Sequence, residues 1–296
     1  MKLCRFEAAG QVQAGFYEDT QVRPIPDSTD SDLLDFLPGG DRFEEAQRLH
    51  ETGELASKPI DSVRLLVPNP KPNKLFLLAG NYAKHIEEGG EAAGERAETF
   101  PYVFMKPPST TLNHPGDPVR IPSVSPYHID WELELGVVIG KGGKCIQEAD
   151  ALGHVAGYTI FNDISDRQFR PNHDRKERPK DKFFDWLHGK WHDSSCPCGP
   201  CIASSHTLTD PQSLAMQLRV NGELRQDAST AQQIFPVAAV IEFISSFVTL
   251  EPGDMISTGT AAGVGRTSGT YLHPGDEIEA TIEGIGTLVS TVVAEI

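Results

Sequence analysis

The sequence has no apolar run long enough to cross a bilayer, and it has few basic residues for its acidic content. A spanning helix needs roughly 20 consecutive apolar residues, and the first residues, Met1 to Glu7, carry charges where a secretory signal needs an apolar stretch. Lys and Arg number 26 against 42 Asp and Glu, which gives a net charge of −16. Such a field repels phosphate backbones and anionic lipids. We therefore expect a soluble, cytoplasmic protein without a nucleic-acid or membrane partner.

Cysteine is also scarce. The chain has five cysteines, an odd number without the paired spacing of a disulfide framework, so reduced thiols are expected. Cys196, Cys198 and Cys201 lie close enough in sequence to suggest zinc. Structural zinc needs four ligands, usually as two pairs, and the chain offers no second pair. Packing is therefore the better interpretation of these thiols.

Glycine and proline are plentiful, with 27 and 22 residues, which favours a turn-rich globular chain with much β structure. The segment 67–73 holds three prolines and cannot be helical. It predicts a boundary between a small N-terminal domain, residues 1–70, and a larger second domain, residues 71–296.

Short apolar runs bounded by Gly or Pro predict buried strands in the larger domain, at 74–78, 102–105, 133–139 and from 155 to 163. Helices are expected at 43–50, 82–98, 147–151 and 235–246. Asp41 could cap the first of these helices, because a carboxylate there accepts from the free N–H groups of the first turn.

The strongest chemical signal is a pair of carboxylates at the start of a buried strand. The period of two of a strand puts Glu132 and Glu134 on one face, together with Asp130. Unpaired acids beside an apolar run are costly, and a hard cation offsets that cost. Asp163, at the end of another apolar strand, would complete three oxygen ligands and leave positions for water and substrate. The alternatives are solvated acids on an edge strand and a structural turn at Asp163.

Six stretches in order resemble the fumarylacetoacetate hydrolase family, especially its acylpyruvase and 2-hydroxyhepta-2,4-diene-1,7-dioate isomerase type of member. They are 80–85, 104–107, 132–134, 157–163, 220–223 and 250–260, and the resemblance covers about residues 73–296. It implies an α+β, β-rich fold in which a mixed β-roll forms the catalytic domain with a helical lid, usually in a homodimer. It also implies Mg²⁺ or Mn²⁺, with Ca²⁺ as an alternative, bound by Glu132, Glu134 and Asp163.

The resemblance further implies a catalytic pair on the lid, His85 and Glu88, and a catalytic lysine, Lys190, that would hold the substrate carboxylate or enolate oxygen. The glycines after Glu88 offer a hinge for lid closure. Segment 167–182 carries seven basic and three acidic residues, and is either a solvated loop or a flap that gathers substrate. Arg170 stands where some relatives carry glutamine. The candidate substrate-binding residues are Tyr82, Lys106, Arg167, Arg170 and Thr260.

These residues together favour a divalent-metal-dependent hydrolase. It would cleave a C–C bond in a small anionic 2,4-diketo acid, similar to an acylpyruvate, through a metal-bound enolate. His85, oriented by Glu88, would take a proton from the attacking water. Oxaloacetate-type decarboxylation and isomerisation of an enol or keto acid use the same enolate and are alternatives. A non-catalytic metal-binding protein is an alternative of another class, although ligands, lid pair and lysine together argue against it.

Overall fold

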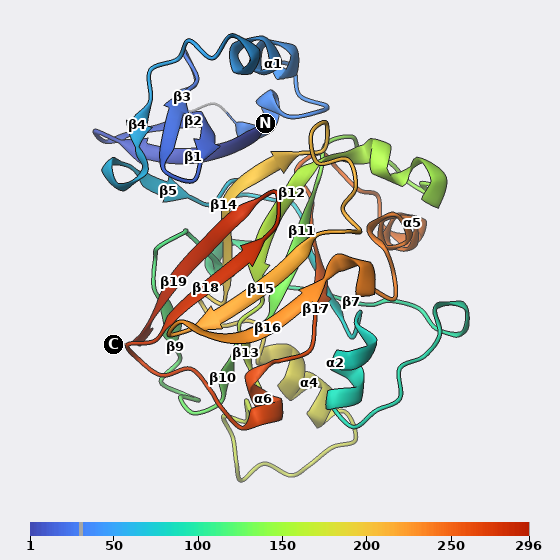
Figure 1. Cartoon of the computed structure of the whole chain (residues 1–296). Coiled ribbons are helices and arrows are strands. Elements are labelled where there is room, and N and C mark those ends of the chain that lie inside the picture. The colour runs from blue at the N-terminus through green and yellow to red at the C-terminus, as the bar shows by residue number, and fades with distance from the viewer. Residues whose placement is uncertain (30–31, 296) are drawn as a thin grey trace.

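The computed structural model describes residues 1–29 and 32–295, and its largest feature is a mixed sheet of 12 strands (Figure 1). Ten strands follow in the order β4-β3-β2-β1-β14-β12-β11-β17-β6-β7, while β5 pairs with β1 and β8 pairs with β14. Their bounds are β1 Lys2–Ala8, β2 Gln11–Glu18, β3 Gln21–Pro24, β4 Lys58–Pro59, β5 Arg64–Leu66, β6 Leu75–Ala79, β7 Tyr102–Met105, β8 Leu112–Asn113, β11 Leu133–Ile139, β12 Val155–Asn162, β14 Cys196–Ser204 and β17 Met255–Thr260. The strands expected at 74–78, 102–105, 133–139 and from 155 are present.

The N-terminal part forms one end of this sheet. Strands β1 to β5 pack with the short 3₁₀ helices η1 (Leu33–Phe36) and η2 (Ile60–Ser62) and with α1 (Phe43–Thr52). Helix α1 matches the expected helix at 43–50 and ends at Gly53, whose left-handed φ of 66° suits glycine. The proposed cap was wrong, because Arg42 occupies the N-cap position and makes no side-chain cap bond. Strand β1 joins the rest of the sheet by pairing with β14.

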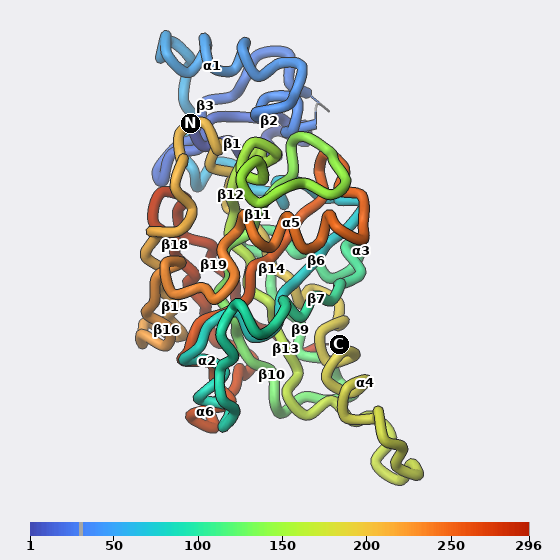
Figure 2. The backbone as a smooth tube through the Cα atoms, turned by 90° about the vertical axis from the view of Figure 1, so that its right-hand side faces the viewer, coloured from blue at the N-terminus to red at the C-terminus, as the bar shows by residue number. Residues whose placement is uncertain are grey.

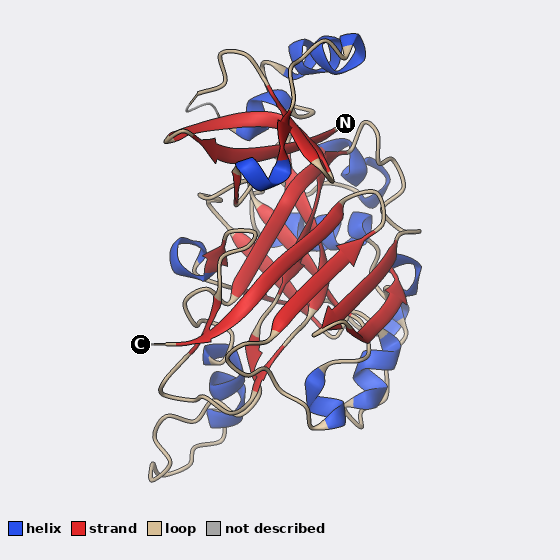
Figure 3. Cartoon of the chain, turned by 60° about the vertical axis from the view of Figure 1, so that its left-hand side comes forward, coloured by secondary structure: helices blue, strands red, loops and turns tan. Residues whose placement is uncertain are grey.

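A second sheet of five strands packs on the first in the order β16-β15-β18-β19-β9 (Figure 3). Apolar side chains of both sheets share one core, including Leu135 and Tyr158 from the large sheet and Leu218 and Ile278 from the small one. The strands are β9 Val119–Ile121, β15 Ala215–Val220, β16 Glu223–Ser229, β18 Glu277–Ile282 and β19 Gly286–Ala294, with a separate pair β10 Ile129–Asp130 and β13 Ser165–Asp166. The predicted β-rich α+β fold with a small N-terminal domain is confirmed.

Strands β11 and β12 form the antiparallel centre of the large sheet, and every residue of both is buried. They are apolar on both faces because structure covers them on both sides. Leu133 pairs with Asn162, so the start of β11 lies beside the end of β12. Gly136 is required here, because a Cβ would lie 2.6 Å from the Phe161 ring.

The helices agree with expectation in part. Helix α5 (Val237–Phe247) matches the one expected at 235–246, and the helix expected at 147–151 is the 3₁₀ helix η4 (Glu148–His154). The helix expected at 82–98 was wrong: α2 covers only Ala83–Glu88, because Gly89 and Gly90 end it, and a loop leads to η3 (Arg96–Glu98). The remaining helical turns are α3 Pro108–Thr111, α4 Asp181–His188, η5 Thr230–Gln232 and α6 Gly265–Ser268.

Helices α2, α4 and α6 lie toward the end of the molecule opposite the N-terminal domain, with α2 next to α6 and α4 on the other side (Figures 1 and 2). Helix α4 was not expected, because segment 167–182 was interpreted as a loop or flap. Its Arg175 pairs with Asp185, which ties the basic segment to the helix that follows. No helix among the described residues has the length and apolar character needed to span a membrane.

Candidate metal centre and cleft

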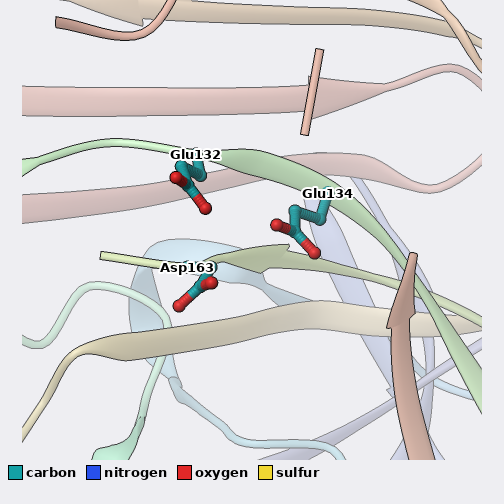
Figure 4. A group of neighbouring side chains, drawn as sticks. All are labelled: Glu132, Glu134 and Asp163. Carbon is teal, nitrogen blue, oxygen red and sulfur yellow. The ribbon is translucent and has the colours of Figure 1, made fainter. Parts of the chain in front are cut away.

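Three buried carboxylates converge where β11 begins and β12 ends (Figure 4). Glu134 lies in β11, Glu132 just before it, and Asp163 directly after β12. Each offers one oxygen, and these oxygens lie within 4.8 Å of one another. The antiparallel register of the two strands explains this geometry, because it brings residues 30 positions apart to the same edge.

Two cations pair with Glu132 and two with Asp163. Lys190 Nζ lies 2.8 Å from Glu132 Oε2 and 2.7 Å from Asp163 Oδ2. Arg167 Nη2 lies 2.6 Å from Glu132 Oε1, and Lys106 Nζ lies 2.5 Å from Asp163 Oδ1. Burial favours the neutral form of Glu132, but the charges of Arg167 and Lys190 outweigh it and hold the pKa of Glu132 far below its usual range.

Glu134 is the carboxylate with the weakest compensation. Its Oε2 accepts hydrogen bonds from Ser257 Oγ at 2.6 Å and from the Gly259 N–H at 2.8 Å. Its Oε1 is buried and has no hydrogen-bond partner among the described residues. Burial and the charges of Asp163 and Glu132 raise the pKa of Glu134 well above its ordinary value. An unpartnered buried oxygen among acids fits a hard divalent cation such as Mg²⁺ or Mn²⁺.

Three of the basic residues expected at the site are therefore directed at carboxylates. Besides Asp163, the ammonium of Lys106 donates to the carbonyls of Ile164 at 3.0 Å and Ser195 at 2.6 Å. Arg167 also donates from Nε to Asp130 Oδ2 at 2.7 Å. Lys106 and Arg167 therefore position the acids and balance their charge.

Asp130 connects this cluster to the loop before α6. Its carboxylate is fully buried and accepts from Arg167 Nε, from the N–H of Trp131 at 2.8 Å, from the N–H of Gly265 at 2.6 Å and from the N–H of Arg266 at 3.0 Å. The sequence indicated its face of the strand but not these partners, two of which, Gly265 and Arg266, lie more than 130 positions away.

A cleft of about 830 Å³ is lined by residues that include His85, Glu88, Trp186, Arg266 and Arg167, the last of which contacts Glu132. Helix α2 supplies the first two. His85 Nδ1 lies 4.0 Å from Glu88 Oε2, and both oxygens of Glu88 accept from the Gly263 N–H at 3.1 Å. Burial lowers the pKa of His85, so the neutral imidazole is favoured at neutral pH.

The other candidate residues, Tyr82, Thr260 and Arg170, do not line the cleft. The Tyr82 hydroxyl is buried at 3.4 Å from Met216 Sδ. Thr260 Oγ1 donates to the Leu133 carbonyl at 3.0 Å and accepts from Gln226 at 2.9 Å, so it fixes the start of β11. Arg170 pairs with Glu177 at 3.1 Å and does not line the cleft. All five cysteines are free thiols, four of them buried, and they form no metal-binding group with other described residues.

Sequence reasoning missed Ser257, Gly259 and Trp186. The first two bind Glu134, and Gly259 has a φ of 87° that only glycine adopts readily. The stretch 250–260 carries the family resemblance, but only Thr260 was given a role in it, although Gly259 was the signal of an unusual backbone. Trp186 lies on α4, a helix that the sequence did not indicate, so its place in the cleft lining was not predicted either.

Comparison with known proteins gives the family. The family model for the fumarylacetoacetate (FAA) hydrolase C-terminal domain matches residues 74–293. The chain belongs to the fumarylacetoacetate hydrolase family. The family predicted from the sequence is thus confirmed, and a second model, the Rv2993c-like N-terminal domain, matches residues 1–68.

Relatives cover almost the whole chain. It is 40% identical to the oxaloacetate tautomerase YisK of Bacillus subtilis over 282 residues, which is 90% of this chain and 87% of that protein. The fumarylacetoacetate hydrolase of Exiguobacterium antarcticum is 33% identical, with a TM-score of 0.81 and full coverage of both chains. The maleylpyruvate hydrolase of Sphingobium sp. SYK-6, solved with manganese(II) and pyruvate, is 27% identical with a TM-score of 0.77, again with full coverage of both. Such relatives support an enzyme that processes keto acids.

Proposed function

We propose that this enzyme interconverts the keto and enol forms of a small 2-keto dicarboxylate of the oxaloacetate type. The observation that carries the proposal is His85, a cleft imidazole whose pKa is lowered by burial and which lies near enough to Glu132 to respond to its charge. A neutral imidazole can take a proton from carbon and return it to oxygen. The identity to an oxaloacetate tautomerase supports the same chemistry.

A divalent metal at Glu132, Glu134 and Asp163 is part of this proposal, with Mg²⁺ or Mn²⁺ as the ion and Ca²⁺ as the alternative. The unpartnered Glu134 Oε1 supports it, as does the manganese in a related hydrolase. When bound, the cation supplies a Lewis acid for the carboxylate and keto oxygens of the substrate.

His85, Glu88 and Lys190 have different roles in this proposal. His85 takes the proton from C3, next to the keto group, and becomes imidazolium; the proton then goes to the keto oxygen to complete the enol. Glu88, held by the Gly263 N–H, keeps α2 in place and stabilises the imidazolium. Lys190 keeps a positive charge beside Glu132 and Asp163, where negative charge develops on the substrate oxygen.

Hydrolysis of a C–C bond in a 2,4-diketo acid, the reaction favoured by the sequence, is the second candidate. The His85 and Glu88 pair favours it, because an oriented imidazole can also deprotonate water. The related maleylpyruvate hydrolase supports it too. Decarboxylation of oxaloacetate would need no activated water.

One panel separates these reactions. The purified protein with Mg²⁺ or Mn²⁺ is incubated with enol-oxaloacetate, oxaloacetate and several acylpyruvates, while enol absorbance, CO₂ release and cleavage products are followed. We expect fast loss of the enol signal. Acylpyruvate cleavage without tautomerisation would favour the second candidate, and inactivity on every compound would favour a non-catalytic metal-binding protein.

A further inference from the structure

The cleft has an uneven charge distribution. Three acids line it, Glu88 at the end of α2 and Glu91 and Glu98 on the segment that follows, together with Phe100 and Tyr102. Its only arginines among the described lining residues are Arg167 and Arg266. A substrate with two carboxylates must therefore find its second positive partner at one of these two side chains, since acids repel it elsewhere.

Arg167 already forms ion pairs within the protein. It contacts Asp130 at 2.7 Å and Glu132 at 2.6 Å, and its side chain is 9% exposed. The two carboxylates raise the pKa of Arg167 further despite its burial. Releasing this guanidinium for a substrate would leave Glu132 and Asp130 without a buried counter-charge, which is costly.

Arg266 has the opposite character. Its side chain is exposed, and its guanidinium makes no ion pair or hydrogen bond with any described residue. Its backbone is nonetheless fixed, because its N–H donates at 3.0 Å to Asp130 Oδ2, the oxygen that also accepts from Arg167. The backbone of Arg266 is therefore held at a set position relative to Asp130 and Arg167, and the residue lines the cleft.

We propose that Arg266 binds the distal carboxylate of the substrate and makes the enzyme selective for dicarboxylates over monocarboxylates. This inference rests on the proposed function, in which the keto-acid end lies at the three metal-binding carboxylates. An arginine guanidinium presents paired N–H donors that match a carboxylate. The acids on the cleft wall repel that carboxylate, so Arg266 is its cationic partner.

The test measures binding without turnover. L-malate and 2-hydroxybutanoate are hydroxy acids of equal carbon number that differ in the distal carboxylate, and neither carries a keto group. Their dissociation constants are measured by calorimetry on the Mn²⁺-saturated protein, its Arg266→Gln and Arg266→Lys variants, and Arg64→Gln. Arg64 serves as the control. It is an exposed arginine on β5 of the N-terminal domain, and it pairs with Asp117.

We expect Arg266→Gln to weaken malate binding about fivefold or more and to leave 2-hydroxybutanoate unchanged, as an ion pair at an exposed site allows. Arg266→Lys should keep part of the preference, and Arg64→Gln all of it. An unchanged malate affinity in Arg266→Gln, or an equal loss for both ligands, would overturn the proposal. Because no reaction is measured, this outcome is independent of whether oxaloacetate is tautomerised.

Discussion

At Glu134, the stability of the folded state and the proposed metal binding make opposite demands on the charge of the carboxylate. Its buried Oε1 lacks a donor, and two other carboxylates lie close by, so in the absence of a cation its ionised form destabilises the folded state. The raised pKa of Glu134 has the same cause, because burial and the neighbouring acids disfavour its ionised form. Since the folded pKa exceeds the unfolded one, the native state loses stability as pH rises above the unfolded value of about 4.3.

Replacing Glu134 by Gln should therefore stabilise the metal-free protein while removing metal binding. We expect a gain on the order of 1 kcal/mol, because the amide keeps an acceptor for Ser257 and Gly259 without a buried charge. Thermal melting with and without Mn²⁺ measures this. The parent should melt higher with Mn²⁺ and the variant should not respond. Glu277→Gln, on an exposed position of β18, is the control, and a variant stabilised by Mn²⁺ like the parent would rule out this role of Glu134.

His85 should affect turnover and not metal binding. It lies on α2, which is remote in sequence from β11 and β12, and it is not one of the three clustered acids. We expect His85→Ala to lower kcat by about 10² to 10⁴, the usual contribution of a positioned base, and Glu88→Gln to cost less. Calorimetry with Mn²⁺ should give parental affinity in both. A His85→Ala variant that turns over substrate at the parental rate would require another base.

The pH profile tests the same imidazole. Activity needs the neutral ring, so kcat/KM should fall as pH drops through the pKa of His85. Burial lowers that pKa, and the acid limb should lie below the ordinary histidine value of about 6.5. The charge of Glu88 raises the pKa, so Glu88→Gln should move the limb to still lower pH. A limb above 6.5, or one that Glu88→Gln leaves in place, would contradict the assignment.

At the scale of elements, the site depends on close contact between β11 and β12. Gly136 pairs with Thr159 across this ladder, and a Cβ at Gly136 would lie 2.6 Å from the Phe161 ring and 2.8 Å from Thr159 Cγ2. Neither neighbour can move freely, because all three residues are buried. The two strands position Glu134 and Asp163, so strain here should reach the proposed metal site.

Gly136→Ala should destabilise the protein by about 1–3 kcal/mol through overpacking and should weaken Mn²⁺ binding. Urea unfolding gives the first quantity and calorimetry the second. Gly153→Ala is a matched control, because a Cβ at Gly153 meets nothing within 4 Å. Equal unfolding midpoints for the two variants would show that β11 and β12 can separate without loss.

At the scale of the whole molecule, the large sheet ends at a partly exposed strand, β7. Strand β7 ends the strand order and pairs only with β6 among the described strands. Its Tyr102 is 62% exposed and its Met105 41% exposed. An exposed apolar edge strand favours association with another chain, which agrees with the homodimer proposed from the family resemblance.

We therefore expect a dimer that Tyr102→Lys weakens, because a charged edge residue opposes strand pairing. Light scattering at micromolar concentration should give twice the chain mass of 32.3 kDa for the parent and a lower value for the variant. Tyr127→Lys, at an exposed loop tyrosine, is the control. A parental mass near 32.3 kDa would contradict the dimer.

The sequence by itself determined the β-rich fold, the family and the group of three acids. Alternation places Glu132 and Glu134 on one face of a strand, and the order of six stretches carried the resemblance. Local signals were less reliable at element ends: helix α2 stops at Gly89 and Gly90 although the sequence favoured a longer helix. The conformational freedom of a Gly-Gly pair ends a helix even where helix-forming residues follow it.

Only the tertiary structure decided which charges pair. Lys106, Arg167 and Lys190 could each have bound substrate, yet all three contact buried carboxylates contributed by other segments. Asp130 reaches Gly265 and Arg266 across more than 130 positions, and no local pattern encodes such a contact. The reason is physical: the energy of a buried charge depends on the partners that folding brings within a few ångströms, whereas strand alternation and turn formation depend on neighbours in the chain.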